Sequence, residues 1–224
     1  MDRRVFLALG AAGVLGAGGW WLMAPRGPQT VLPGVADAQT PANGAAPDFE
    51  RVPDMVRGDP DAPVEVIEYA SLTCPHCANF HRNVYPQLVE NYIEPGLVRF
   101  IHREVYFDRY GLWAAMLARC GSESRYFPML DMIYSTQSDW AGSSDPAQVA
   151  ENLRAMGRRS GLSNDQVDAC LQDAEQAQAM VAVYQHYASE HQINSTPSFV
   201  IDGERHGNMS YDDFAALLDG KLGG

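Results

Sequence analysis

Residues 64–77 read V-E-V-I-E-Y-A-S-L-T-C-P-H-C, and they combine a strand-like segment with two closely spaced cysteines. Its first part, Val64–Ala70, is short, rich in strand-forming residues and preceded by a proline, which predicts a β-strand. The residues that follow, up to Ile93, carry apolar side chains at fourfold spacing, which predicts a helix that Pro86 kinks without ending it. Leu97–Val105 then predicts a second strand, parallel to the first because a helix-length crossover separates the two.

The remainder of the chain extends this pattern. Helical patterns run almost without interruption over residues 107–192, with a capping-box sequence that starts at Ser163. Ser198–Ile201 predicts a third strand, and Asp202-Gly203 predicts a tight turn into an antiparallel partner, which a final helix follows. The order of elements predicts an α/β protein with a thioredoxin-like core and a helical insertion between the second and third core strands.

The N-terminal region has a different composition. Residues 1–24 join a charged start to an uncharged apolar run, which predicts a signal peptide or an N-terminal membrane anchor. The opening R-R-V-F-L resembles a twin-arginine signal, and a general secretory signal is the alternative. Residues 25–50 contain many prolines and glycines and predict a disordered linker, which leaves residues 51–224 as the folded domain. With either signal we expect the domain to be exported, to the periplasm or another extracytoplasmic space.

The net charge of −12 argues against a nucleic-acid partner, because nucleic acids are bound by basic surfaces. The pair Cys74 and Cys77 could form a redox disulfide, contribute to a metal site, or be two inert thiols. A structural zinc site needs four ligands, but the chain has no second C-x-x-C, and its closely spaced histidines, His186 and His191, lie far from the pair. Copper(I) bound by the two thiolates stays open.

The position of the two cysteines favours redox chemistry, because they follow a strand and open a helix within a β-α-β unit. The helix N-terminus stabilises a thiolate on Cys74 and lowers its pKa. Pro75 suits the first helical turn, where a backbone N–H has no partner. His76 adds a nearby positive charge when it is protonated, and Cys77 should lie one turn further in. We therefore expect Cys74 to be the exposed, reactive thiol.

The C-P-H-C motif resembles that of the DsbA family of exported thiol oxidases, which belongs to the thioredoxin superfamily. The resemblance extends from about residue 63 to the C-terminus. Glu68 lies six residues before Cys74, where DsbA-like proteins carry a buried acid, and the resemblance implies that it relays a proton. Thr196-Pro197 matches the cis-proline loop of the superfamily, which implies that this backbone binds an extended substrate chain. The acid that some members carry a few residues after the motif is replaced by His81 or its neighbours.

The two remaining cysteines, Cys120 and Cys170, lie fifty residues apart among apolar residues of the predicted insertion. As free thiols they would be small core residues. In an exported protein an even number of cysteines favours pairing, so we expect a structural disulfide, with two free thiols as the alternative. Some alphaproteobacterial DsbA-like proteins resemble this arrangement.

Together these features predict an exported thiol:disulfide oxidoreductase that introduces disulfide bonds into secreted or periplasmic proteins through Cys74 and Cys77. It would need no cofactor beyond the redox disulfide and no metal. Its partners would be extended, cysteine-containing substrate proteins and, by resemblance, a quinone-linked membrane oxidase that reoxidises it. The alternatives are a disulfide isomerase or reductase of the same fold, because Thr196 before the proline also occurs in those relatives, and a periplasmic copper-binding protein.

Overall fold

The computed structural model describes residues 46–223, so the predicted signal and most of the predicted linker lie outside the described residues. The strands are β1 (Met55–Arg57), β2 (Val64–Ala70), β3 (Val98–Glu104), β4 (Ser198–Ile201) and β5 (Glu204–His206). The helices are α2 (Pro75–Asn83), α3 (Tyr85–Leu88), the π-helical turn η1 (Val89–Ile93), α4 (Arg109–Ala118), the 3-10 turn η2 (Glu123–Arg125), α5 (Tyr126–Ser135), α6 (Gln137–Ala141), α7 (Pro146–Arg159), α8 (Asn164–Gln172), α9 (Ala174–Glu190) and α10 (Tyr211–Leu222).

The five strands form one sheet in the order β1-β3-β2-β4-β5. The central strand β2 pairs in parallel with β3 and antiparallel with β4, which confirms the predicted thioredoxin-like core. Asp202 and Gly203 both have positive φ, at 46° and 84°, and form the predicted tight turn between β4 and β5. The sequence did not predict β1, which adds three residues to the free edge of β3.

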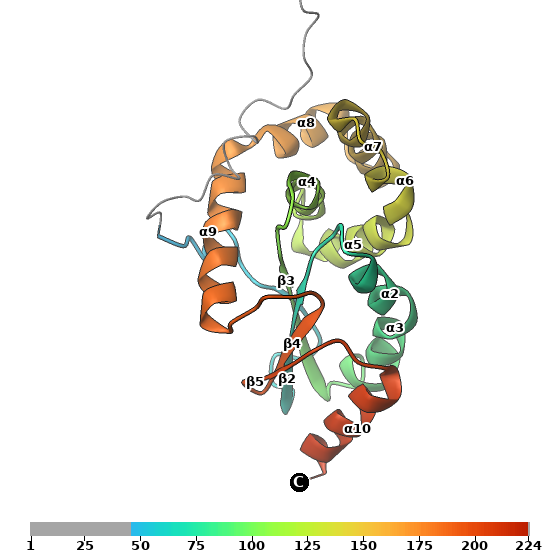
Figure 1. Cartoon of the computed structure of the whole chain (residues 1–224), viewed down its shortest axis with the longest axis vertical. Helices are drawn as coiled ribbons and strands as arrows, with labels where there is room; N and C mark the ends of the chain where they lie inside the picture. Colours follow the sequence, from blue (N-terminus) through green and yellow to red (C-terminus); the bar gives the residue numbers. More distant parts are fainter. Residues whose placement is uncertain (1–45, 224) are drawn as a thin grey trace, which may run out of the picture. The chain divides into compact units, whose positions relative to one another are not determined.

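Helices cover both faces of the sheet (Figure 1). The α2, α3 and α10 side buries a group of aromatic rings that includes Phe80, Phe199 and Phe214. On the other face, α9 packs Tyr184 and Tyr187 against residues of the central strands. Because both faces are covered, β2 is buried along almost its whole length.

The helix predicted after the C-P-H-C motif is divided into three pieces. It is interrupted at Val84, two residues before Pro86, and then resumes as α3 and η1. The missing N–H of the proline removes a helical hydrogen bond at this point, which accounts for the interruption.

The helical insertion comprises α4 to α9, between β3 and β4. Its α8 begins with the predicted capping box at Ser163, in which the side chains and backbone N–H groups of Ser163 and Gln166 bond reciprocally. A disulfide joins Cys120, just after α4, to Cys170 of α8, with their Cα atoms 5.8 Å apart. Within residues 46–223, no helix is both long enough and apolar enough to cross a membrane.

Candidate active site

The C-P-H-C motif lies where β2 meets α2. Cys74 is the N-cap residue of α2, and Pro75 occupies the first helical turn. The Cys74 side chain is half-buried, whereas the Cys77 side chain, one turn further along the helix, is fully buried. His76 is exposed at the surface beside them. The structure thus places the accessible thiol of Cys74 one helical turn from the inaccessible thiol of Cys77.

The surroundings of the two thiols shift their pKa values in opposite directions. A hydrogen bond from the Cys77 thiol, supported by the backbone N–H groups of His76 and Cys77, lowers the pKa of Cys74 to about 5 against the effect of partial burial. Burial raises the pKa of Cys77, and the nearby charges of Cys74 and Glu68 raise it further. At neutral pH, Cys74 is therefore a thiolate and Cys77 a neutral thiol that donates to it.

A segment far along the chain completes the surface around Cys74. The Thr196-Pro197 peptide bond is cis, and the Thr196 carbonyl oxygen lies 3.5 Å from the Cys74 sulfur. Pro197, directly before β4, is buried, while Thr196 is only partly buried. The antiparallel pairing of β4 with β2 brings this segment next to the thiol.

Glu68 lies beneath the thiols as a buried carboxylate on β2. Its Oε2 atom is 2.8 Å from Nε2 of His81 on α2, and 4.0 Å from Nε2 of His102 on β3. The parallel register pairs Glu68 directly with His102, which explains why the two side chains meet. Burial lowers the pKa of His102 to about 4, so this imidazole is neutral at neutral pH.

A chain of hydrogen bonds continues from His102 into the insertion. His102 Nδ1 lies 2.7 Å from the Tyr126 hydroxyl, which donates to Glu104 at 2.8 Å. Glu104 forms two bonds of 2.7 Å with Arg119, whose charge and hydrogen bonds lower the pKa of this carboxyl against the effect of burial. Because Tyr126 donates its proton to Glu104, it accepts one from His102, and the neutral imidazole carries its proton on Nδ1.

A family model described as Thioredoxin matches residues 50–220. The crystal structure of Wolbachia pipientis alpha-DsbA1 superimposes with a TM-score of 0.70 at 30% identity, covering 76% of this chain and 92% of that one. This chain belongs to the DsbA family. A Rickettsia conorii relative named a protein-disulfide oxidoreductase is 34% identical over 75% of the chain, which spans only 60% of that relative's length. BdbD from Bacillus subtilis, at 19% identity and a TM-score of 0.68, shares the fold.

In this DsbA-family chain, the loop before Cys74 is held by residues that the sequence did not single out. Gln137 donates from its side-chain amide to the carbonyl oxygens of Leu72, at 2.8 Å, and Cys74, at 3.1 Å. The Thr73 hydroxyl donates to the Asp108 carboxylate at 2.6 Å. Gln137 and Asp108 both belong to the insertion, so their role could not be inferred from the residues near the motif.

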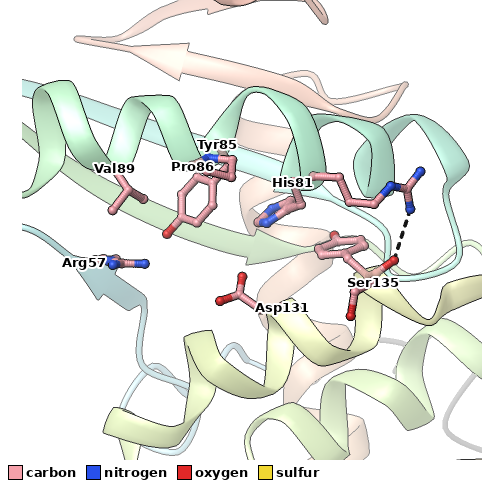
Figure 2. A pocket seen from close by; sticks show the side chains of 9 residues that line it. Arg57, His81, Tyr85, Pro86, Val89, Asp131 and Ser135 are labelled. Carbon is pink, nitrogen blue, oxygen red and sulfur yellow. Dashed lines mark hydrogen bonds between the residues drawn. The ribbon is translucent and has the colours of Figure 1, made fainter.

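His81 also reaches a cavity of about 390 Å³ behind α2, on the side away from β4. Figure 2 shows the imidazole pointing into this space, with Asp131 of α5 on the opposite wall and Tyr85 beside it. Burial raises the pKa of Asp131. Arg57 and Arg82 also line the cavity, which therefore carries charges of both signs.

Proposed function

We propose that this chain is an exported thiol:disulfide oxidoreductase that introduces disulfide bonds into secreted or periplasmic proteins. The observation that carries the proposal is the placement of a half-buried Cys74 at the N-terminus of α2 and of a fully buried Cys77 one turn further in, which lowers the pKa of Cys74 to about 5 and raises that of Cys77. A stable Cys74 thiolate stabilises the reduced form of the pair. The disulfide between the two cysteines is therefore a strong oxidant. Family membership supports the same chemistry, and export rests on the signal that the sequence predicts.

The reaction begins with the oxidised pair. A substrate thiolate attacks the Cys74 sulfur, a new sulfur–sulfur bond forms, and the Cys74–Cys77 bond breaks with its electron pair on Cys77. A second substrate thiolate then attacks the substrate sulfur of this mixed disulfide and releases Cys74 as a thiolate. Two electrons pass from the substrate to the pair, and the substrate gains a disulfide. The low pKa of Cys74 favours this direction because it makes Cys74 a good leaving group.

In this scheme Cys77 must gain a proton as it leaves and lose one when the pair is reoxidised. Glu68 is buried, and its charge contributes to the raised pKa of Cys77, which supports a role in this proton transfer. His81 lies 2.8 Å from the carboxylate and connects it to the cavity behind α2. We assign Glu68 the transfer of the Cys77 proton, and His76 a contribution to the charge at the surface.

The substrate would lie across the surface formed by Cys74 and Thr196. The Thr196 backbone is next to the Cys74 sulfur and only partly buried, so an extended chain can pair with it while its own cysteine reacts. Substrates are then extended segments of unfolded, cysteine-containing proteins. By family resemblance, a quinone-linked membrane oxidase returns the pair to its oxidised state, and no cofactor other than the disulfide takes part.

The equilibrium of the purified chain with glutathione tests the proposal, together with the rate at which the oxidised chain forms disulfides in a reduced, unfolded ribonuclease. We expect an oxidising potential, rapid disulfide formation, and complete loss of activity in Cys74→Ser. A strongly reducing equilibrium would refute the oxidase proposal and favour a reductase, and preferential repair of scrambled ribonuclease would favour an isomerase. Tight copper binding that Cys74→Ser abolishes, without disulfide formation, would favour the copper-binding alternative.

The role of Glu68 has a separate test with a matched control. Glu68→Gln should slow disulfide exchange by at least about 10-fold, because removing a positioned acid–base group costs this much or more. Glu65 lies three residues earlier on the same strand, but it is paired with Arg99 and is much more exposed than Glu68. Glu65→Gln should leave the exchange rate unchanged. Equal rates in the two variants would exclude Glu68 from proton transfer.

A further inference from the structure

Three buried side chains converge beneath the cysteines from three different elements. Glu68 of β2, His81 of α2 and His102 of β3 each offer one ligand atom, and these atoms lie within 4.8 Å of one another. All three residues are buried. The sequence predicts no metal site because these residues are spread over 35 positions without a ligand motif, whereas the register of β2 and β3 brings them together.

The hydrogen bonding of this cluster is incomplete. Among the described residues, Glu68 Oε1, His81 Nδ1 and His102 Nε2 have no hydrogen-bond partner, although all three atoms are buried. Buried polar atoms of this kind are rare in folded proteins, because each lost hydrogen bond with water must be replaced. No described protein group uses these three atoms, which therefore remain available to a ligand.

The tautomer of His102 indicates which kind of ligand fits the cluster. Its Nδ1 proton is directed to Tyr126, so Nε2 presents a lone pair to the Glu68 carboxylate 4.0 Å away. His102 Nε2 and Glu68 Oε2 thus face each other, each with a lone pair and with no protein donor between them. His81 can also present a lone pair from Nε2 if its proton moves to Nδ1. This change breaks no hydrogen bond at Nδ1, because that atom has no partner among the residues that the structure describes. A cation would accept a lone pair from the Nε2 atoms of both histidines and from the Glu68 carboxylate.

We propose that Glu68, His81 and His102 bind a divalent transition-metal ion, and that Zn²⁺ is the ion that suits them best. Two imidazoles and one carboxylate are a zinc donor set, with a fourth position left for water. Ligand atoms at tetrahedral zinc lie about 3.3 Å apart for bonds near 2.0–2.1 Å. The distances from Glu68 Oε2 to His81 Nε2, 2.8 Å, and to His102 Nε2, 4.0 Å, lie on either side of this value, and all three ligand atoms lie within 4.8 Å of one another, so binding an ion requires the side chains to adjust.

Groups behind the ligands favour the same assignment. The chain Tyr126–Glu104–Arg119 orients His102 and fixes its tautomer, as outer hydrogen bonds do for zinc-binding histidines. The cavity behind α2 is lined by His81, so it reaches one of the three proposed ligands. Asp131 and two arginines line that cavity together, so its charges of opposite sign do not favour cations. The ligand atoms must therefore determine which ion binds. This consequence rests on the proposed function: an ion bound to Glu68 would prevent this carboxylate from transferring the Cys77 proton and would slow disulfide exchange.

Zinc titration of the full chain tests this site, with the Cys74–Cys77 pair oxidised so that its thiols cannot bind the metal. We expect calorimetry to show one equivalent of Zn²⁺, and Co²⁺ to give the intense visible absorption of a tetrahedral site. His102→Gln and His81→Gln should lose this binding. His186→Gln is the matched control, because His186 lies 3.7 Å from Glu190 in an exposed pair on α9 and should contribute nothing.

Tyr126→Phe provides a variant that keeps every ligand. It removes the hydrogen bond that orients His102 and should weaken zinc binding by about 10- to 100-fold. Cooperative urea unfolding of each variant verifies that it is folded. Absence of stoichiometric binding by the oxidised wild-type chain at micromolar Zn²⁺ would overturn the proposal, as would loss of binding in His186→Gln instead of the cluster variants. Neither result depends on oxidase activity, so a failed metal site and a failed proposed function are distinguishable.

Discussion

The stability of the reduced protein should depend on pH through the Cys74 thiolate. The pKa of this group is about 5 in the folded chain, and it is about 8.5 for an unperturbed cysteine. Because the folded value is the lower one, the thiolate stabilises the folded state. This contribution is fully present above about pH 8.5, decreases as the pH falls, and is lost as the pH falls through about 5.

The size of the effect follows from the two pKa values. Between them the free energy of unfolding changes by at most about 1.4 kcal/mol per pH unit, which gives about 2.7 kcal/mol at pH 7, two units above the folded pKa. Cys74 is only half-buried, and solvent screening weakens its interactions. We therefore expect about half of this value, roughly 1.4 kcal/mol, which corresponds to about 30 mV in the potential of the pair.

Urea unfolding of the reduced wild type and of reduced Cys74→Ser, from about pH 5 to about pH 8, measures this contribution. Subtracting the variant removes the other titrating groups, which are common to both chains. The difference in unfolding free energy should rise with pH by up to about 1.4 kcal/mol per pH unit between the folded and the unfolded pKa values, because screening narrows this pH range without lowering the limiting slope. A difference that stays flat or falls over this range would show that the folded chain does not stabilise the thiolate.

Three further predictions concern packing and buried polar groups. Gln137→Leu should lower the unfolding free energy by about 1–3 kcal/mol and slow disulfide exchange, since it leaves the Leu72 carbonyl without its donor and the Cys74 carbonyl with only the helical bond from Ala78; an unchanged exchange rate would contradict this. Arg119→Met should cost about 3–5 kcal/mol in urea unfolding because it strands a buried carboxylate, whereas Arg154→Met, in a more exposed pair, should cost about 1 kcal/mol or less; equal costs would argue against the distinction. Gly157→Ala should destabilise the chain by about 1–3 kcal/mol because its Cβ would lie 2.6 Å from a side-chain methyl group of α8. Gly220→Ala, with nothing within 4 Å, should stabilise α10 by about 0.5 kcal/mol in the same thermal or urea assay; the opposite order would refute the packing argument.

The core of the fold could be predicted from the sequence because its signals are local. Strand composition, the capping box at Ser163 and the Asp202-Gly203 turn each act over a few residues, and the order of elements then restricts the topology. The strand β1 could not be predicted in this way. Its three residues are too short for a periodic pattern, and they become a strand only through pairing with the edge of β3.

The buried part of the site shows where local signals end. Cys74, Cys77 and Glu68 could be found because they belong to a motif or lie at a fixed distance from it. His102 lies within a predicted strand, but its contact with Glu68 depends on the exact pairing of β2 with β3. Gln137 belongs to α6, whose position beside the active-site loop is decided by tertiary contacts, so no pattern in its neighbours indicated its two bonds to that loop.

The support of the active-site loop limits how the motif can be transplanted. Residues 71–74 receive hydrogen bonds from Tyr134 and Gln137 and give one to Asp108, and all three residues belong to the insertion. A smaller thioredoxin scaffold that received only the Cys-Pro-His-Cys tetrapeptide would acquire the thiols and the start of the helix without these three anchors. In protein engineering, the transferable unit of this chain is therefore the loop together with the helices that brace it.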